Sequence, residues 1–103
     1  EAINTHIVKT TNGPRRLTLI GELGPKGQFI GKMDHLVCFL PGTLALGFYH
    51  GLDSWHLNLA SRLMDSCYEM YNSTETGLSP EIIHFKVLEA DKNDEQGKFF
   101  RQV

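Results

Sequence analysis

The clearest periodic pattern in the chain lies between residues 55 and 71. Apolar side chains recur there at intervals of four, four and three residues, at Leu59, Leu63, Cys67 and Met70. This spacing places the four side chains on one face of an α-helix. Three further residues widen the apolar stripe, namely Ala60, Met64 and Tyr71. The pattern therefore predicts a helix that is buried over a broad face.

A shorter helix is predicted before this long one. Pro41 suits the first turn of a helix, where its missing N–H costs no hydrogen bond, and Gly51 is a typical terminator. Asp53 or Ser54 is placed to cap the start of the long helix. The apolar run of residues 36–40 is expected to be a buried strand or the beginning of the shorter helix.

Runs of β-forming residues flank the two helices. Residues 16–23 and 28–33 lie on either side of the turn at residues 24–27, so a β-hairpin is predicted. Residues 82–88 predict another strand, and the polar residues 72–77 before it predict an exposed loop.

The two ends of the chain carry weaker signals. Residues 2–9 are predicted to be the tail of a helix that stops at Asn12-Gly-Pro14. The charged residues 89–97 predict a surface loop. The broad apolar faces of the two helices exceed what so short a chain buries by itself, so we expect them to pack against neighbours outside it.

Length and composition restrict the class of protein. The chain has 103 residues, 41% apolar and 21% charged, which suits one small globular domain. Its net charge of −2 disfavours a nucleic-acid partner, and no apolar run approaches the ~20 residues of a membrane span. No signal peptide is visible, the first residue is Glu1 rather than Met, and the chain ends on the apolar Val103 with no terminating signal. These features favour a fragment of a longer protein.

Two cysteines and one sequon bear on the cellular compartment. Cys38 and Cys67 lie twenty-nine positions apart, and their number alone fits either two buried thiols or a disulfide. Asn72-Ser-Thr74 satisfies the N-glycosylation pattern in a predicted loop. Together these features lean toward a secretory compartment.

Few residues suggest chemistry by themselves. His50 and His56 are six positions apart in different predicted elements, so they lack the helical spacing of metal ligands. Asp34 and His35 precede an apolar run, where they are either a satisfied structural pair or polar groups at a cavity wall that bind a sugar hydroxyl. Glu81 is either a solvated carboxylate or one of the two carboxyl groups that glycoside hydrolysis requires.

The block of residues 32–47, Lys-Met-Asp-His-Leu-Val-Cys-Phe-Leu-Pro-Gly-Thr-Leu-Ala-Leu-Gly, is highly specific. It resembles the corresponding block of the endoplasmic-reticulum class I α-1,2-mannosidases of glycoside hydrolase family 47. Blocks at residues 17–23, 65–71 and 75–82 agree in order and spacing. The resemblance covers nearly the whole chain and is weakest at residues 1–15 and 88–103.

The resemblance implies a mainly α fold, in which residues 1–103 are part of an (α/α)7-barrel catalytic domain with short β-hairpins. It implies an inverting, Ca²⁺-dependent enzyme that removes terminal α-1,2-linked mannose from high-mannose N-glycans on glycoproteins. The implied location is the lumen of the endoplasmic reticulum or Golgi, with any membrane anchor outside this segment.

The resemblance also implies residue roles. Cys38 and Cys67 match a family disulfide, His35 matches a substrate-contacting histidine with Asp34 beside it, and Glu81 matches a conserved acid assigned as proton donor. The other family carboxylates and the Thr that binds Ca²⁺ have no counterpart here, so no metal ligand is expected in the chain. The 103 residues alone are therefore expected to be inactive.

Two alternatives to a trimming enzyme remain open. A lectin-like member of the same superfamily would recognise misfolded glycoproteins in ER-associated degradation with little or no trimming. A small disulfide-braced interaction module would have no catalytic role.

Overall fold

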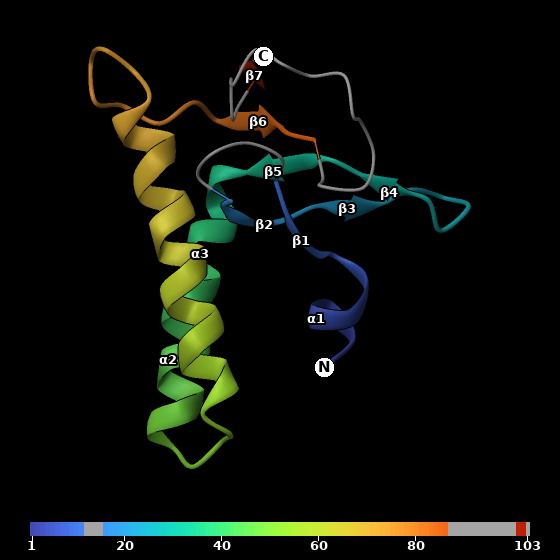
Figure 1. Ribbon diagram of the computed structural model, residues 1–103, viewed down its shortest axis with the longest axis vertical. Helices are drawn as coiled ribbons and strands as arrows, with labels where there is room; N and C mark the ends of the chain where they lie inside the picture. Colours follow the sequence, from blue (N-terminus) through green and yellow to red (C-terminus); the bar gives the residue numbers. More distant parts are fainter. Residues whose placement is uncertain (12–15, 87–100, 103) are drawn as a thin grey trace.

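A computed structural model describes residues 1–11, 16–86 and 101–102 of the chain. Its largest elements are two helices, α2 (Leu40–Tyr49) and α3 (Trp55–Asn72), which pack side by side as an antiparallel hairpin (Figure 1). Short antiparallel strands lie to one side of this hairpin. The chain is thus partly helical with small strand pairs, in agreement with the predicted element types.

Helix α3 buries the predicted stripe. Leu59, Leu63, Cys67 and Met70 are all buried, as is Ala60 beside them. The expectation for the other two flanking residues was wrong, because Met64 is 49% exposed and Tyr71 is 46% exposed. The stripe is narrower than predicted on that side, and the polar Ser66 and Glu69 are buried in addition.

The apolar run before α2 forms a 3₁₀ helix, η1 (His35–Phe39), rather than a buried strand. Leu36 and Phe39 are 70% and 82% exposed, so the expectation of a buried strand was wrong. The alternative expectation, the beginning of the shorter helix, was confirmed, because η1 runs directly into α2 at Leu40. Residues three apart lie on the same side of a 3₁₀ helix, which turns the side chains of Leu36 and Phe39 outward. Val37 and Cys38 lie between them and pack against the core.

The ends of the two long helices follow the predicted signals in part. Pro41 lies in the first turn of α2, and Gly51 follows this helix with a φ of +101°, a conformation that glycine adopts without strain. Ser54 is the residue before α3, but its side chain makes no capping hydrogen bond. Instead, the Asp53 carbonyl accepts a hydrogen bond from the backbone N–H of His56 at 3.1 Å.

Among the described residues, seven short strands form three small sheets. The pairs are β1 (Val8–Thr10) with β2 (Thr18–Ile20) and β3 (Glu22–Leu23) with β4 (Phe29–Ile30). The third sheet has the order β5 (Lys32–Asp34), β6 (Ile82–His84) and β7 (Arg101–Gln102). All the pairings are antiparallel.

The predicted hairpin exists only next to its turn. Leu23 pairs with Phe29 there, and Gly27 takes a φ of +78° in the turn. Each predicted run breaks at a glycine, Gly21 or Gly31, beyond which the strand changes partner. A Cβ on Gly31 would collide with the Phe85 carbonyl oxygen, while the Gly31 carbonyl accepts the Phe85 N–H at 2.9 Å. This close approach of two backbones turns the run from β3 toward β6.

The first helix is shorter than predicted. Helix α1 (Ala2–His6) ends before the β-branched Ile7 and Val8, and β1 then pairs with β2 through Val8 and Ile20. The predicted continuation to Lys9 was therefore wrong. The Asn12–Pro14 stop lies outside the described residues, as do the end of the predicted strand at residues 87–88 and the loop at 89–97.

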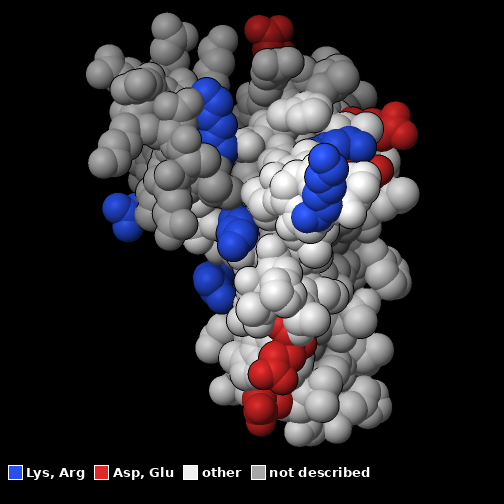
Figure 2. Space-filling model, turned by 90° about the vertical axis from the view of Figure 1, so that its right-hand side faces the viewer, with Lys and Arg blue, Asp and Glu red and all other residues white. Residues whose placement is uncertain are grey.

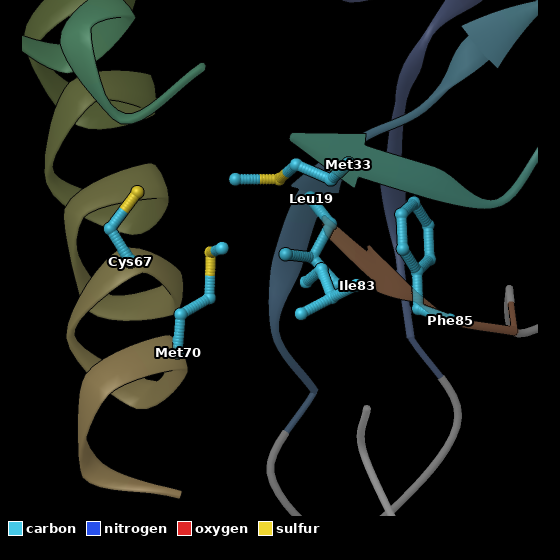
Figure 3. Close-up of a cluster of buried hydrophobic side chains, with 6 residues drawn as sticks. All are labelled: Leu19, Met33, Cys67, Met70, Ile83 and Phe85. Carbon is cyan, nitrogen blue, oxygen red and sulfur yellow. The ribbon is translucent and has the colours of Figure 1, made fainter. Parts of the chain in front are cut away.

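The main core lies between α3 and the strands. Figure 3 shows Cys67 and Met70 of α3 facing side chains from the strand side of the molecule, namely Leu19, Met33, Ile83 and Phe85. A second buried cluster contains Ile20, Leu59 and Leu63. Within the described residues, no helix is both long and apolar enough to cross a membrane.

Candidate functional site

The pairing of β5 with β6 creates the candidate site. Asp34 is the last residue of β5 and pairs with Ile82, so the following His35 lies next to Glu81. The backbone N–H of His35 donates to the Glu81 carbonyl at 2.8 Å. Two segments that are 46 positions apart in the sequence thus bring all three predicted site residues together.

Side-chain contacts fix the geometry of this group. The Nδ1 atom of His35 lies 3.2 Å from the Glu81 carbonyl oxygen and 3.5 Å from Oδ1 of Asp34. The same Asp34 oxygen accepts the backbone N–H of Leu36 at 3.3 Å and so caps η1. Asp34 therefore both starts the 3₁₀ helix and contacts the ring of His35.

The three residues are accessible to a ligand. The side chains of Asp34 and His35 are 38% and 39% exposed, and Glu81 is exposed. The apolar surroundings that a glycosidase general acid needs are not supplied to Glu81 by the described residues. On the face drawn in Figure 2, one group of acidic side chains lies at the lower end and others lie at the top and upper right, while the Lys and Arg side chains lie above the lower group.

A disulfide anchors the turn that carries His35. Cys38 of η1 is bonded to Cys67 of α3, with Cα atoms 5.9 Å apart, which confirms the predicted pairing. Sδ of Met70 lies 3.9 Å from Sγ of Cys38. The turn is therefore tied covalently to the buried face of the longest helix, three residues after His35.

The sequon lies at the surface. Asn72 is the last residue of α3 and is exposed. The hydroxyl oxygen of Thr74 lies 3.0 Å from the Tyr71 carbonyl and 2.9 Å from the Leu78 carbonyl. The amide of Asn72 is thus accessible at the point where the helix gives way to a loop.

The described residues do not fit a calcium site by themselves. Among residues 1–11, 16–86 and 101–102, no three His, Cys, Asp or Glu side chains gather closely enough to hold a metal ion. Ca²⁺ takes six to eight oxygen ligands, so its ligands in a calcium-dependent enzyme would have to come from other residues.

Comparison with known proteins identifies the family. Residues 1–102 match glycosyl hydrolase family 47. The chain belongs to this family. It is 56% identical over 87 residues to the human endoplasmic reticulum mannosyl-oligosaccharide 1,2-alpha-mannosidase, an alignment that covers 84% of the chain and 12% of that protein. The rat enzyme of the same name is 54% identical over 95% of the chain and 15% of its own length.

A plant member of the family is also similar. The mannosyl-oligosaccharide 1,2-alpha-mannosidase MNS3 of Arabidopsis thaliana is 47% identical over 78% of the chain and 15% of its own length. The chain therefore spans about 12–15% of the length of these curated relatives.

Sequence reasoning chose the three site residues but missed the contact that joins them. The contact runs through the backbone carbonyl of Glu81, and residue type carries no signal for a backbone atom. It also missed the buried Ser66, whose hydroxyl donates to the Thr18 carbonyl. A serine on the edge of an apolar helical stripe was the only available hint.

Proposed function

We propose that the protein containing this chain is an exo-α-1,2-mannosidase that removes terminal mannose from N-linked oligomannose glycans. The family match over residues 1–102 carries this proposal. The names of the human and rat relatives, both endoplasmic reticulum 1,2-alpha-mannosidases, support it. In this proposal the reaction inverts the anomeric centre and depends on Ca²⁺, and the enzyme works in the lumen of the endoplasmic reticulum or Golgi.

The proposed roles of the site residues come from the family resemblance, and the proximity of His35, at the end of β5, to Glu81, just before β6, supports them. His35 binds a mannose hydroxyl, Asp34 binds substrate beside it and orients the ring, and Glu81 donates a proton to the leaving oxygen. Inverting hydrolysis needs a second carboxylate to activate water. The second carboxylate and the apolar wall around Glu81 come from other parts of the protein.

The proposed architecture is a segment of an (α/α)7 barrel that belongs to the catalytic domain. The antiparallel hairpin of α2 and α3 supports it, because such a barrel is built from paired helices. The exposed apolar residues of this hairpin, Leu46, Phe48 and Tyr49 among them, are surfaces that neighbouring helices would cover. Asn72 is the proposed glycosylation acceptor, and any membrane anchor lies outside this segment.

The decisive experiment measures mannose release from an oligomannose glycan by the full-length protein, with and without EDTA. Release that EDTA abolishes supports the proposed Ca²⁺-dependent enzyme. Glu81→Gln is expected to slow release about 10²- to 10⁴-fold, the usual contribution of a general acid. Glu75→Gln is the matched control, because Glu75 is an exposed glutamate in the preceding loop and no catalytic role is proposed for it.

The other outcomes are equally informative. A protein that binds the glycan without releasing mannose would be a lectin-like member, contrary to the proposal. Full activity of Glu81→Gln would leave the enzyme intact but remove Glu81 from the role of acid.

A further inference from the structure

We propose that the backbone carbonyl of Glu81, together with the Asp34 carboxylate, holds His35 with its hydrogen on Nδ1, so that Nε2 accepts a hydrogen bond from a sugar hydroxyl. This inference rests on the proposed function. It specifies the direction of one hydrogen bond, in which the substrate hydroxyl donates and Nε2 of His35 accepts. It also gives Glu81 a positioning role through its backbone that is independent of its carboxylate.

Two hydrogen-bond acceptors face Nδ1 of His35. A carbonyl oxygen offers only lone pairs, and it lies 3.2 Å from Nδ1. An ionised carboxylate also offers only lone pairs, and Oδ1 of Asp34 lies 3.5 Å from the same atom. A bare Nδ1 would face two acceptors, whereas a protonated Nδ1 donates to the nearer one. The surroundings therefore place the hydrogen on Nδ1.

A hydrogen on Nδ1 determines the hydrogen-bonding role of the other ring nitrogen, Nε2. A neutral imidazole carries one hydrogen, so Nε2 keeps a lone pair when Nδ1 is protonated. The side chain is 39% exposed, which leaves part of the ring accessible. A lone pair at an accessible nitrogen suits a hydroxyl donor. A sugar supplies such a hydroxyl donor.

The orientation of the ring is built into the fold. The Glu81 oxygen that faces Nδ1 also accepts the backbone N–H of His35 at 2.8 Å, so it is fixed by strand pairing. The neighbouring pair of that register, Met33 and Ile83, is fully buried. Beyond His35, the disulfide at Cys38 holds the turn. The ring is thus oriented before any substrate arrives.

The direct test is long-range ¹H–¹⁵N NMR of the full-length protein with selectively labelled histidine, near neutral pH. The His35 signal is assigned by its loss in His35→Gln. We expect a pyrrole-type Nδ1 and a pyridine-type Nε2. A pyrrole-type Nε2, whether in the other tautomer or in an imidazolium, overturns the inference. The readout needs no activity, so it stands or fails separately from the proposed mannosidase function.

Two substitutions test the same idea through catalysis. The amide of Gln reaches the position of Nε2, whereas the amide of Asn reaches that of Nδ1. His35→Gln is therefore expected to keep more of kcat/KM than His35→Asn, by about tenfold, the worth of one hydrogen bond. The reverse order would place the functional contact at Nδ1 and contradict the inference. His50→Gln, at an exposed histidine after α2, is the control.

Substrate analogues test the direction of the hydrogen bond. In a mannobiose series, each hydroxyl of the terminal ring is replaced in turn by hydrogen or by fluorine, which accepts but does not donate. At the hydroxyl that His35 contacts, both replacements are expected to cost wild-type kcat/KM about tenfold and to cost His35→Asn little. If the fluoro sugar retains wild-type kcat/KM there, His35 is the donor and the inference is wrong.

Asp34 is tested as a positioning residue by a matched pair. Asp34→Asn keeps an oxygen that caps η1, whereas Asp34→Ala removes both the cap and the contact with the ring. We expect Asn to preserve folding and the pyridine-type Nε2 signal, because the nearer Glu81 carbonyl remains. Loss of that signal in Asp34→Asn would assign the tautomer to Asp34 alone and overturn the role of Glu81.

Discussion

The two long helices of this chain differ in how far their apolar side chains are buried. Helix α3 is amphipathic and turns its apolar stripe toward the strands, where Leu63 and Met70 are almost completely buried. Helix α2 is apolar nearly all round, yet of its ten residues, all within the described part of the chain, only Pro41 is buried. A helix with apolar residues on every side is normally enclosed by its neighbours.

One apolar surface is covered within the chain, and the other is exposed. The inner face of α3 packs on the local strands and needs no further partner. The outer side of η1 and α2, which includes Phe39, Leu46 and Tyr49, carries apolar surface that is not covered within the described residues. This side is the surface that the proposed barrel would enclose.

The largest expected effect comes from breaking the link between the two regions. Replacing both Cys38 and Cys67 by Ala removes the bond between η1 and α3 across a separation of 29 residues. The loop-entropy relation predicts a loss of about 3.5 kcal/mol in the free energy of unfolding. Urea unfolding of the chain measures this loss. A change below about 1 kcal/mol would mean that packing alone holds η1 in place.

The next effect tests the inner face of α3. Leu63→Ala empties a site that is 1% exposed and is expected to cost about 3 kcal/mol of unfolding free energy. Met64→Ala is the control on the adjacent position, where the side chain is 49% exposed, and should cost less than about 1 kcal/mol. Equal losses in the same urea series would show that the two faces are not distinct.

A polar contact within the same interface gives a smaller effect. Ser66 is fully buried and its hydroxyl donates to the Thr18 carbonyl, so Ser66→Ala leaves that buried oxygen without its donor. The expected loss is about 2 kcal/mol. Ser61→Ala, on the exposed side of α3, should change stability by less than about 0.5 kcal/mol. Thermal unfolding of the three proteins compares them, and a neutral Ser66→Ala would contradict the role of this bond.

The smallest expected effect in the chain concerns the exposed ring of Phe39. Phe39 is 82% exposed, so Phe39→Ser should change the unfolding free energy of the 103-residue chain by less than about 0.5 kcal/mol. In the full-length protein, the same change should cost about 3 kcal/mol if a neighbouring helix covers the ring. An equally small effect in both proteins would argue against the proposed enclosure of this side.

Sequence patterns predicted the long helices well because their signals are local. The four-residue spacing of Leu59, Leu63 and Cys67 fixes a helical face whatever surrounds it. The strands were harder, because two continuous runs change partners at Gly21 and Gly31. The change of partner at Gly31 depends on the close approach of the Phe85 backbone, which is distant in the sequence, so no local pattern predicts it.

In the candidate site, too, the residues could be chosen from the sequence, whereas the contact between them could not. Residue types and the family resemblance pointed to Asp34, His35 and Glu81 as separate candidates. Their contact depends on the register in which Asp34 pairs with Ile82, which is a long-range property. The disulfide lay between these cases, since the cysteine count allowed it and the resemblance implied it before the structure confirmed it.

By itself, the sequence determined which residues can be helical, which face of α3 is apolar, and to which family the chain belongs. These are properties of local spacing and residue order, which need no knowledge of neighbours. Only the tertiary structure decided that the run before α2 turns Leu36 and Phe39 outward. It alone placed the Glu81 carbonyl against His35, because the hydrogen bonds between β5 and β6 join segments that the sequence keeps 46 positions apart.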